Sequence, residues 1–131
     1  MPDLYVFQNP NPAANRTEDC VLRAICILED MDWLSCYWKL CYLGAQMYIV
    51  PNNNESVVRA LLLQLGYKSN SLPDTCPVCY TVKDFCLDHP KGKYLLTTNS
   101  HAVAVIDGRY FDSFDSGDEL PIFMWSKEEK E

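Results

Sequence analysis

The spacing of apolar side chains changes once along the chain, near residue 92, and this change limits the possible folds more than any other feature. Before it, apolar residues recur every three or four positions, as on the buried face of an amphipathic helix. Thr17 is a good N-cap before the first run, and Gly66 follows the last run as expected at a helix end. The pattern predicts three helices, at about 17–30, 32–48 and 56–65.

After residue 92 the sequence is rich in Val, Ile, Tyr, Thr and Phe, which favour β-strands. Asp107-Gly108 separates two of these runs and is a strong signal for a hairpin with a two-residue turn. The predicted strands are 93–98, 101–106 and 109–114. We therefore expect an α+β fold, in which N-terminal helices pack on a C-terminal antiparallel β-sheet.

The remaining segments are predicted from turn and helix-breaking residues. Residues 1–16 are rich in Pro and Asn, resist helix formation and are expected to form an extended arm. We expect a loop at 69–80, a short helix from Thr81 to about Asp88, and a charged tail at 127–131. With 131 residues, 48% of them hydrophobic, the chain suits a single domain, 1–131, with one core.

Charge and hydropathy exclude several classes of protein. The formal net charge is −7, and the 11 Lys and Arg are scattered, so attraction to a phosphate backbone is disfavoured. No apolar run has the length of a membrane span, and the first residues lack the pattern of a signal peptide. We expect a cytoplasmic protein that binds neither nucleic acid nor membrane and carries no metal or other cofactor.

Seven cysteines are present, and the odd number without a signal peptide favours free thiols. Packing as small apolar side chains is the expected role of four of them, Cys26, Cys36, Cys41 and Cys86. Cys20 differs because it lies in the first turn of a predicted helix. Unpaired N–H groups and the helix dipole favour a thiolate there and can bind an oxyanion, although Glu18 and Asp19 oppose the effect. Packing remains the alternative for Cys20.

His101 is the candidate general base for Cys20. It opens a predicted strand after Asn99-Ser100, so its ring can reach a helix terminus beyond the sheet. His89 precedes Pro90 in a turn and is expected to be an exposed polar residue.

A third residue that orients the imidazole is expected on the strand after the hairpin. Around a two-residue turn, His101 and Asp112 share one face of the sheet, whereas Asp115 falls on the other. A bulge in the turn would reverse this parity. Asp112 is therefore the predicted orienting acid, and Asp115 is the alternative.

Asp19-Cys20 at a helix start, His101-Ala-Val-Ala-Val and a returning strand with Asp112 follow one another in this order. This arrangement resembles the papain-like cysteine peptidase superfamily, and especially its compact bacterial and phage members such as the bacteriocin-leader peptidases. The TVKDF, HPKG and YxDxxDSG motifs are similar to those of small phage-type proteins. The resemblance covers about residues 15–117.

The resemblance implies a thiol hydrolase that cleaves a peptide or isopeptide-like amide in a peptide or protein substrate. Cys20 would be the nucleophile, His101 the base and Asp112 the orienting acid. In that superfamily a Gln before the Cys usually completes the oxyanion hole. Here this region offers Asn15, whose amide is the expected donor, with Gln8 further away.

Two other interpretations stay open. Cys76 and Cys79 have the spacing of half a zinc site, which Cys86 and His89 could complete. The acidic residues near the C-terminus lack the order of a calcium-binding loop and are expected to be solvated. The alternative function is a non-catalytic interaction protein, for example a phage-encoded inhibitor whose acidic surface occupies a basic site on a host factor.

Overall fold

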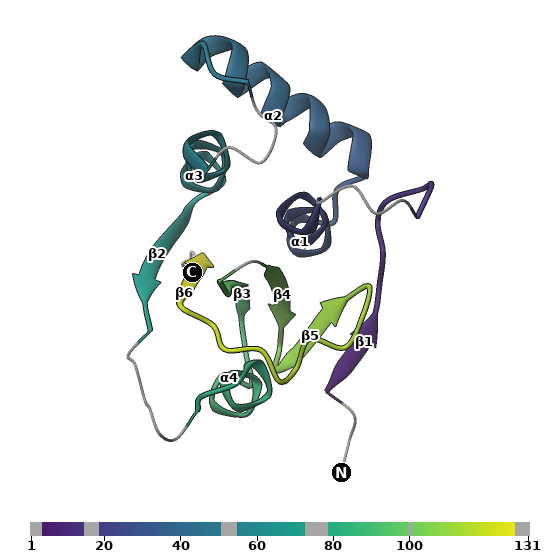
Figure 1. The fold of residues 1–131 in the computed structure, drawn as a ribbon, viewed down its shortest axis with the longest axis vertical. Helices are drawn as coiled ribbons and strands as arrows, with labels where there is room; N and C mark the ends of the chain where they lie inside the picture. Colours follow the sequence, from purple (N-terminus) through teal and green to yellow (C-terminus); the bar gives the residue numbers. More distant parts are fainter. Residues whose placement is uncertain (1–3, 15–18, 51–54, 73–78, 100, 128–131) are drawn as a thin grey trace.

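The computed structural model describes residues 4–14, 19–50, 55–72, 79–99 and 101–127, and confirms an α+β fold. Two helices lie against one face of a six-stranded sheet, a third packs across both of them on the side away from the sheet, and a fourth lies against the other face (Figure 1). The helices are α1 (Cys20–Glu29), α2 (Trp33–Met47), α3 (Glu55–Gln64) and α4 (Val82–Asp88). The strands are β1 (Tyr5–Phe7), β2 (Tyr67–Ser71), β3 (Lys93–Thr97), β4 (Ala102–Ile106), β5 (Arg109–Asp112) and β6 (Phe123–Lys127).

The sheet is mixed, which corrects the expectation of an antiparallel one. Its strand order is β1-β5-β4-β3-β6-β2, and β1 pairs in parallel with β5. The expected extended arm therefore contains an edge strand. A segment of three residues carries too little periodicity to be recognised as a strand from the sequence.

Strands β2 and β6 are also absent from the sequence-based prediction. β2 occupies the start of the expected loop at 69–80, and β6 ends at Lys127, the first residue of the expected tail. β6 lies between β3 and β2 and pairs antiparallel with both. Ser, Asn and Lys fill most of β2, so its strand conformation depends on pairing with β6 rather than on local preference.

The hairpin between β4 and β5 confirms the predicted two-residue turn. Ile106 pairs with Arg109, and Asp107 and Gly108 both have positive φ, of 49° and 76°. Such dihedrals match the twist of the flanking strands. The start of α4 is confirmed as well, because Thr81 and Asp84 form a reciprocal capping box. The expected N-cap Thr17 lies outside the described residues.

Two apolar cores lie on opposite faces of the sheet, in place of the single core that we expected. The larger core fills the space between α1, α2, α3 and one face of the sheet. The smaller core packs α4 against the other face, around Phe85 and Tyr110. Cys26, Cys36 and Cys86 are buried free thiols, as expected, whereas Cys41 is only half-buried. No helix in the described part of the chain has the length and apolar character needed to cross a membrane.

Candidate active site

Cys20 is the first residue of α1 and is half-buried. The residue before it, Asp19, has non-helical dihedrals, so the helix starts directly at the cysteine. The first N–H groups of a helix have no partner within the helix, and they lie around this side chain. The thiol thus occupies the position where a helix best stabilises negative charge.

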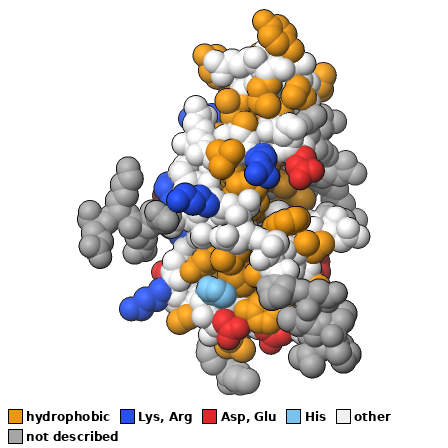
Figure 2. All heavy atoms as spheres, turned by 90° about the vertical axis from the view of Figure 1, so that its left-hand side faces the viewer, with side chains coloured by type: hydrophobic (Ala, Val, Ile, Leu, Met, Phe, Trp, Pro, Cys, Tyr) orange, Lys and Arg blue, Asp and Glu red, His pale blue; other side chains and the backbone are white. Residues whose placement is uncertain are grey.

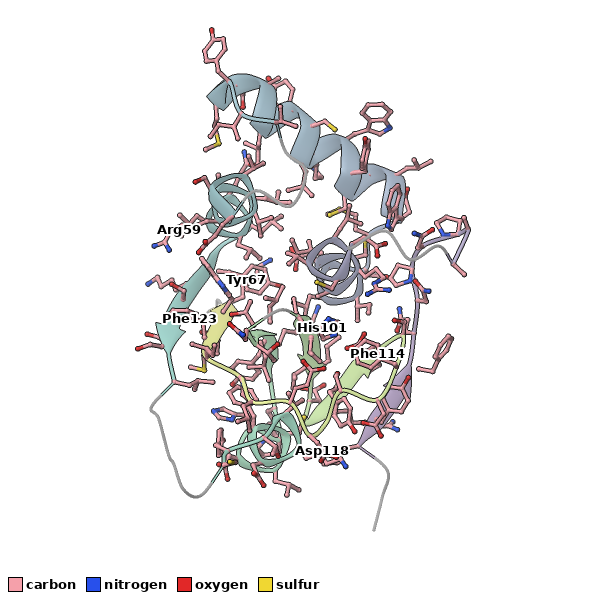
Figure 3. All side chains as sticks on the ribbon, in the orientation of Figure 1. Arg59, Tyr67, His101, Phe114, Asp118 and Phe123 are labelled. Atoms are coloured by element: carbon pink, nitrogen blue, oxygen red, sulfur yellow. The ribbon has the colours of Figure 1, made fainter. Side chains whose placement is uncertain are left out.

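His101 lies just before β4, beneath α1 (Figure 3). Hydrogen bonds with Thr98 hold its backbone: its N–H donates to the Thr98 hydroxyl over 3.1 Å, and its carbonyl accepts from the Thr98 N–H over 2.8 Å and from the Thr98 hydroxyl over 3.3 Å. The ring packs on Phe114 with 4.9 Å between ring centroids, and the side chain is 10% exposed. Both backbone and ring are therefore fixed.

Asp112 ends β5 and places its carboxylate against the His101 ring. Its Oδ2 lies 2.5 Å from Nε2 of His101 and also accepts from the Ser116 hydroxyl over 2.7 Å. Its Oδ1 accepts from the Ser113 N–H over 2.7 Å. These donors hold the carboxylate in one orientation, so the ring is held through Nε2, and Nδ1 is the nitrogen that remains for Cys20.

Cys20 and His101 are close enough for each to change the pKa of the other. Burial alone would raise the pKa of the Cys20 thiol, but the hydrogen bond and charge of His101, with smaller effects of the Ala102 N–H and Arg23, lower it. Burial alone would lower the pKa of His101, but Asp112 and Cys20 raise it to about 9. Both shifts favour a thiolate on Cys20 beside an imidazolium on His101.

The carboxylate of Asp19 has hydrogen-bond donors and a cation around it. It accepts from Asn11 Nδ2 over 3.1 Å and Trp33 Nε1 over 2.9 Å, and it pairs with Arg23 Nε at 3.4 Å. Arg23 also donates to the Ser113 hydroxyl over 3.1 Å, next to Asp112. Asp19 therefore repels a thiolate on Cys20 less strongly than an unpaired carboxylate would.

Asp115, the alternative acid, is exposed and faces other partners. Its Oδ1 accepts from the Tyr110 hydroxyl over 2.5 Å and from the Gly117 N–H over 3.0 Å. These two bonds lower the pKa of Asp115, and the bond from the Tyr110 hydroxyl has the larger effect. The structure therefore brings Cys20, His101 and Asp112 together and places Asp115 outside the group.

The expected oxyanion donor Asn15 lies outside the described residues. The side chain of Gln8 is exposed, and its backbone N–H donates to the Asp112 carbonyl over 2.9 Å. Arg23, Ser113 and Ser116 were not among the candidates from the sequence. Arg23 follows Cys20 by less than one helical turn, and this spacing was the only signal for any of them.

The half zinc site is only partly within the described residues, since Cys76 is outside them. In the part of the chain that the structure describes, no group of three His, Cys, Asp or Glu side chains could hold a metal ion. Burial raises the pKa of Cys86 to about 12. His89 is half-buried rather than exposed, because its ring stacks on Phe85 and its Nδ1 lies 2.9 Å from the Phe85 carbonyl. Both side chains are engaged in the packing of α4.

A cavity of about 510 Å³ opens beside Cys20 and His101, which are both part of its lining. It extends over the sheet face that carries Leu95 and Trp125 and is bounded on the far side by α3. Comparison of the chain with family models, with curated proteins and with solved structures gives no match in any of the three.

Proposed function

We propose that this protein is a cysteine peptidase-like hydrolase, of papain-like type, that cleaves a peptide or isopeptide-like amide in a peptide or protein substrate. One observation carries the proposal. The Cys20 thiol lies beside the His101 ring, and that ring is hydrogen-bonded to the Asp112 carboxylate, at a helix start next to a cavity. A nucleophile, a base and an orienting acid in this order is the arrangement that acyl transfer requires.

The two steps of the reaction follow from the protonation state. The Cys20 thiolate adds to the carbonyl carbon, and the carbonyl π electrons move to oxygen. The C–N bond then breaks as the imidazolium of His101 donates its Nδ1 proton to the leaving amine, which leaves a thioester on Cys20. Water adds to this thioester while His101 accepts a proton, and the acid product leaves as the thiolate is restored.

Charge on the carbonyl oxygen needs donors at the start of α1. The first backbone N–H groups of the helix are suited to this role, because they have no partner within the helix. Asn15 remains the proposed side-chain donor. Asp112 keeps Nδ1 of the ring directed toward Cys20 and stabilises the positive charge on His101 through Nε2.

The alternative, a non-catalytic interaction protein, is favoured by one surface. Leu34, Trp38 and Tyr42 follow one another at four-residue spacing along α2, and each is more than half exposed. Aromatic side chains of this kind are enriched where proteins bind one another. Such a surface is compatible with either function, so the reactivity of Cys20 has to distinguish them.

The test is selective alkylation of Cys20 at pH 7 with limiting iodoacetamide, with each labelled cysteine located by peptide mass mapping. We expect Cys20 to react well before the exposed Cys79, which serves as the internal reference. His101→Gln should slow the alkylation of Cys20, because the pKa of the thiol rises when the hydrogen bond and charge of His101 are removed. A Cys20 rate equal to that of Cys79 and unaffected by His101→Gln would favour the interaction protein.

Hydrolysis is then measured on a mixture of unrelated peptides by mass spectrometry. Wild-type protein should produce new termini, and Cys20→Ser should not. If Cys20 is selectively reactive but no peptide is cut, the proposed hydrolysis of ordinary peptide bonds is contradicted, and isopeptide-linked substrates are the next group to measure.

A further inference from the structure

The walls of the cavity beside Cys20 come from helices α1 and α3 and from strands β2, β3 and β6. One face of α3 contributes Glu55, Val58, Arg59 and Leu62, which recur at helical spacing. The sheet contributes alternating residues of its helix-covered face, Leu95 and Thr97 from β3 and Phe123 and Trp125 from β6. The cavity therefore runs from the reactive pair to α3 across the sheet.

Most of the lining near α3 is apolar. The apolar lining residues include Val58, Leu62, Ile122, Phe123 and Trp125, and Phe123 is 46% exposed. The volume of about 510 Å³ is sufficient for a large side chain together with part of its backbone. Figure 2 shows hydrophobic side chains lying between Lys and Arg on the side of the molecule that carries α3 and β2.

Arg59 is a positive charge in this apolar wall. It extends from α3 on the side of the molecule where Phe123 also lies (Figure 3). Its guanidinium carbon lies 5.7 Å from the centre of the Trp125 ring, and within the described residues it has no carboxylate partner. A guanidinium held over an aromatic ring still has N–H groups to donate, and carboxylates match their geometry.

Glu55 lies one helical turn before Arg59 and also lines the cavity. This spacing would allow an ion pair, yet Arg59 lies over Trp125 instead. Glu55 is at the start of α3, where the helix dipole favours a carboxylate without help from Arg59. With a net charge of −7 the protein repels anions at long range, so Arg59 must act on a carboxylate by direct contact.

We propose that the cavity binds a peptide in which a large apolar side chain is next to an acidic one. The apolar side chain fills the space between α3 and β6, and Arg59 binds the acidic carboxylate at the opening. This inference specifies the substrate of the proposed hydrolase and therefore rests on the proposed function. The test measures binding alone. The inference can therefore be contradicted while the proposed hydrolysis is confirmed, or be confirmed while the proposed hydrolysis is contradicted.

The binding test uses the Cys20→Ala variant and isothermal titration calorimetry with four capped dipeptides. These are N-acetyl-Phe-Glu-amide and N-acetyl-Glu-Phe-amide, each with its Gln counterpart. We expect the better of the two Glu peptides to bind between about two- and fivefold tighter than its Gln counterpart, the range of a partly exposed ion pair. Replacing Phe by Ala in that peptide should abolish detectable binding.

Arg59→Gln is the decisive variant, and Glu55→Gln is its matched control on the same face of α3. Both residues are exposed, so both variants should keep the thermal stability of the parent. Arg59→Gln should remove the preference for Glu over Gln, and Glu55→Gln should keep or increase it. Equal binding of the Glu and Gln peptides by the parent, or a preference that survives in Arg59→Gln, would overturn the inference.

Discussion

At the scale of single residues, the site depends on two groups that shift each other's proton affinity. Cys20 is acidified mainly by the hydrogen bond and charge of His101 against the effect of its own burial, while the pKa of His101 is raised to about 9 by Asp112 and Cys20. The two protons therefore belong to a coupled pair, and different measurements detect different steps of its titration.

A pH series should separate these two steps. Alkylation of Cys20 should rise as the thiolate forms, below the ordinary thiol range, and should not fall again at high pH. Turnover needs the imidazolium proton for the leaving amine, so it should fall as pH rises through about 9. Iodoacetamide rates and peptide hydrolysis, both followed from pH 4 to about 10, check this. If the alkylation rate of Cys20 rises only in the pH range where an ordinary thiol loses its proton, the interaction between Cys20 and His101 is contradicted.

The choice between the two acids is tested by comparing Asp112→Asn with Asp115→Asn. Asp112→Asn should slow alkylation of Cys20 at pH 7, because the pKa of His101 falls when the carboxylate beside Nε2 loses its charge. Turnover should drop by up to about 10⁴-fold, the loss known for a serine triad. Asp115→Asn should leave both rates near wild type. A larger loss from the Asp115 change would show that the orienting acid is misassigned.

The three central residues could be predicted because each has a local sign in the sequence. Cys20 follows a helix-start pattern, His101 opens a strand, and the Asp107-Gly108 turn fixes the parity of Asp112. The residues that hold these three side chains in place have no such local signal in the sequence. Ser116 bonds to Asp112 only because the chain turns back after β5, and Asn11 reaches Asp19 from the segment that follows β1.

At the scale of elements, the elements with strong local signals were predicted and those that depend on distant partners were not. The helices and the hairpin have caps, apolar periodicity or turn residues of their own. β1 pairs with β5 about a hundred positions later, and β2 pairs only with β6. A polar or very short strand at a sheet edge gains its stability from these partners, which the local sequence does not reveal.

The hairpin turn offers a test at this scale. Gly108 has φ of 76°, and a Cβ there would lie 3.2 Å from the Cys86 carbonyl oxygen and 3.2 Å from Pro90 Cα. Gly108→Ala should therefore lower the free energy of unfolding by about 1–3 kcal/mol, measured by urea denaturation. Asp107→Asn is the control, because Asn also suits this turn and keeps the oxygen that accepts from the Gly92 N–H. Equal stability of Gly108→Ala and wild type would show that the turn can relax.

At the scale of the whole molecule, the sheet separates two cores, and only the larger one borders Cys20. The smaller core lies on the face covered by α4, yet it includes Val103 of β4, which begins directly after His101, and Tyr110 of β5, which ends at Asp112. The sequence predicted one core because apolar periodicity does not report which face of a sheet a helix covers.

Phe85 is the residue that best tests the contribution of the smaller core. It is fully buried in α4, so Phe85→Ala should cost about 3–5 kcal/mol of unfolding free energy, measured by urea denaturation. Leu87→Ala is the matched control, because Leu87 is in the same helix and 65% exposed, and it should change stability by less than about 0.5 kcal/mol. Similar losses in the two variants would indicate that α4 packs differently.

The position of β6 determines when, during synthesis, the cavity beside Cys20 can be completed. β6 follows the other five strands in the chain but lies between β3 and β2 in the sheet. A growing chain can form the α1 helix and the β3–β4–β5 part of the sheet, and so assemble Cys20, His101 and Asp112, before β6 exists. The wall of the cavity that holds Phe123 and Trp125 must wait for β6, and β2 cannot join the sheet earlier. Under the proposed function, a nascent chain would thus carry its nucleophile before the substrate cavity is complete, and cleavage would start only after the last strand has been synthesised.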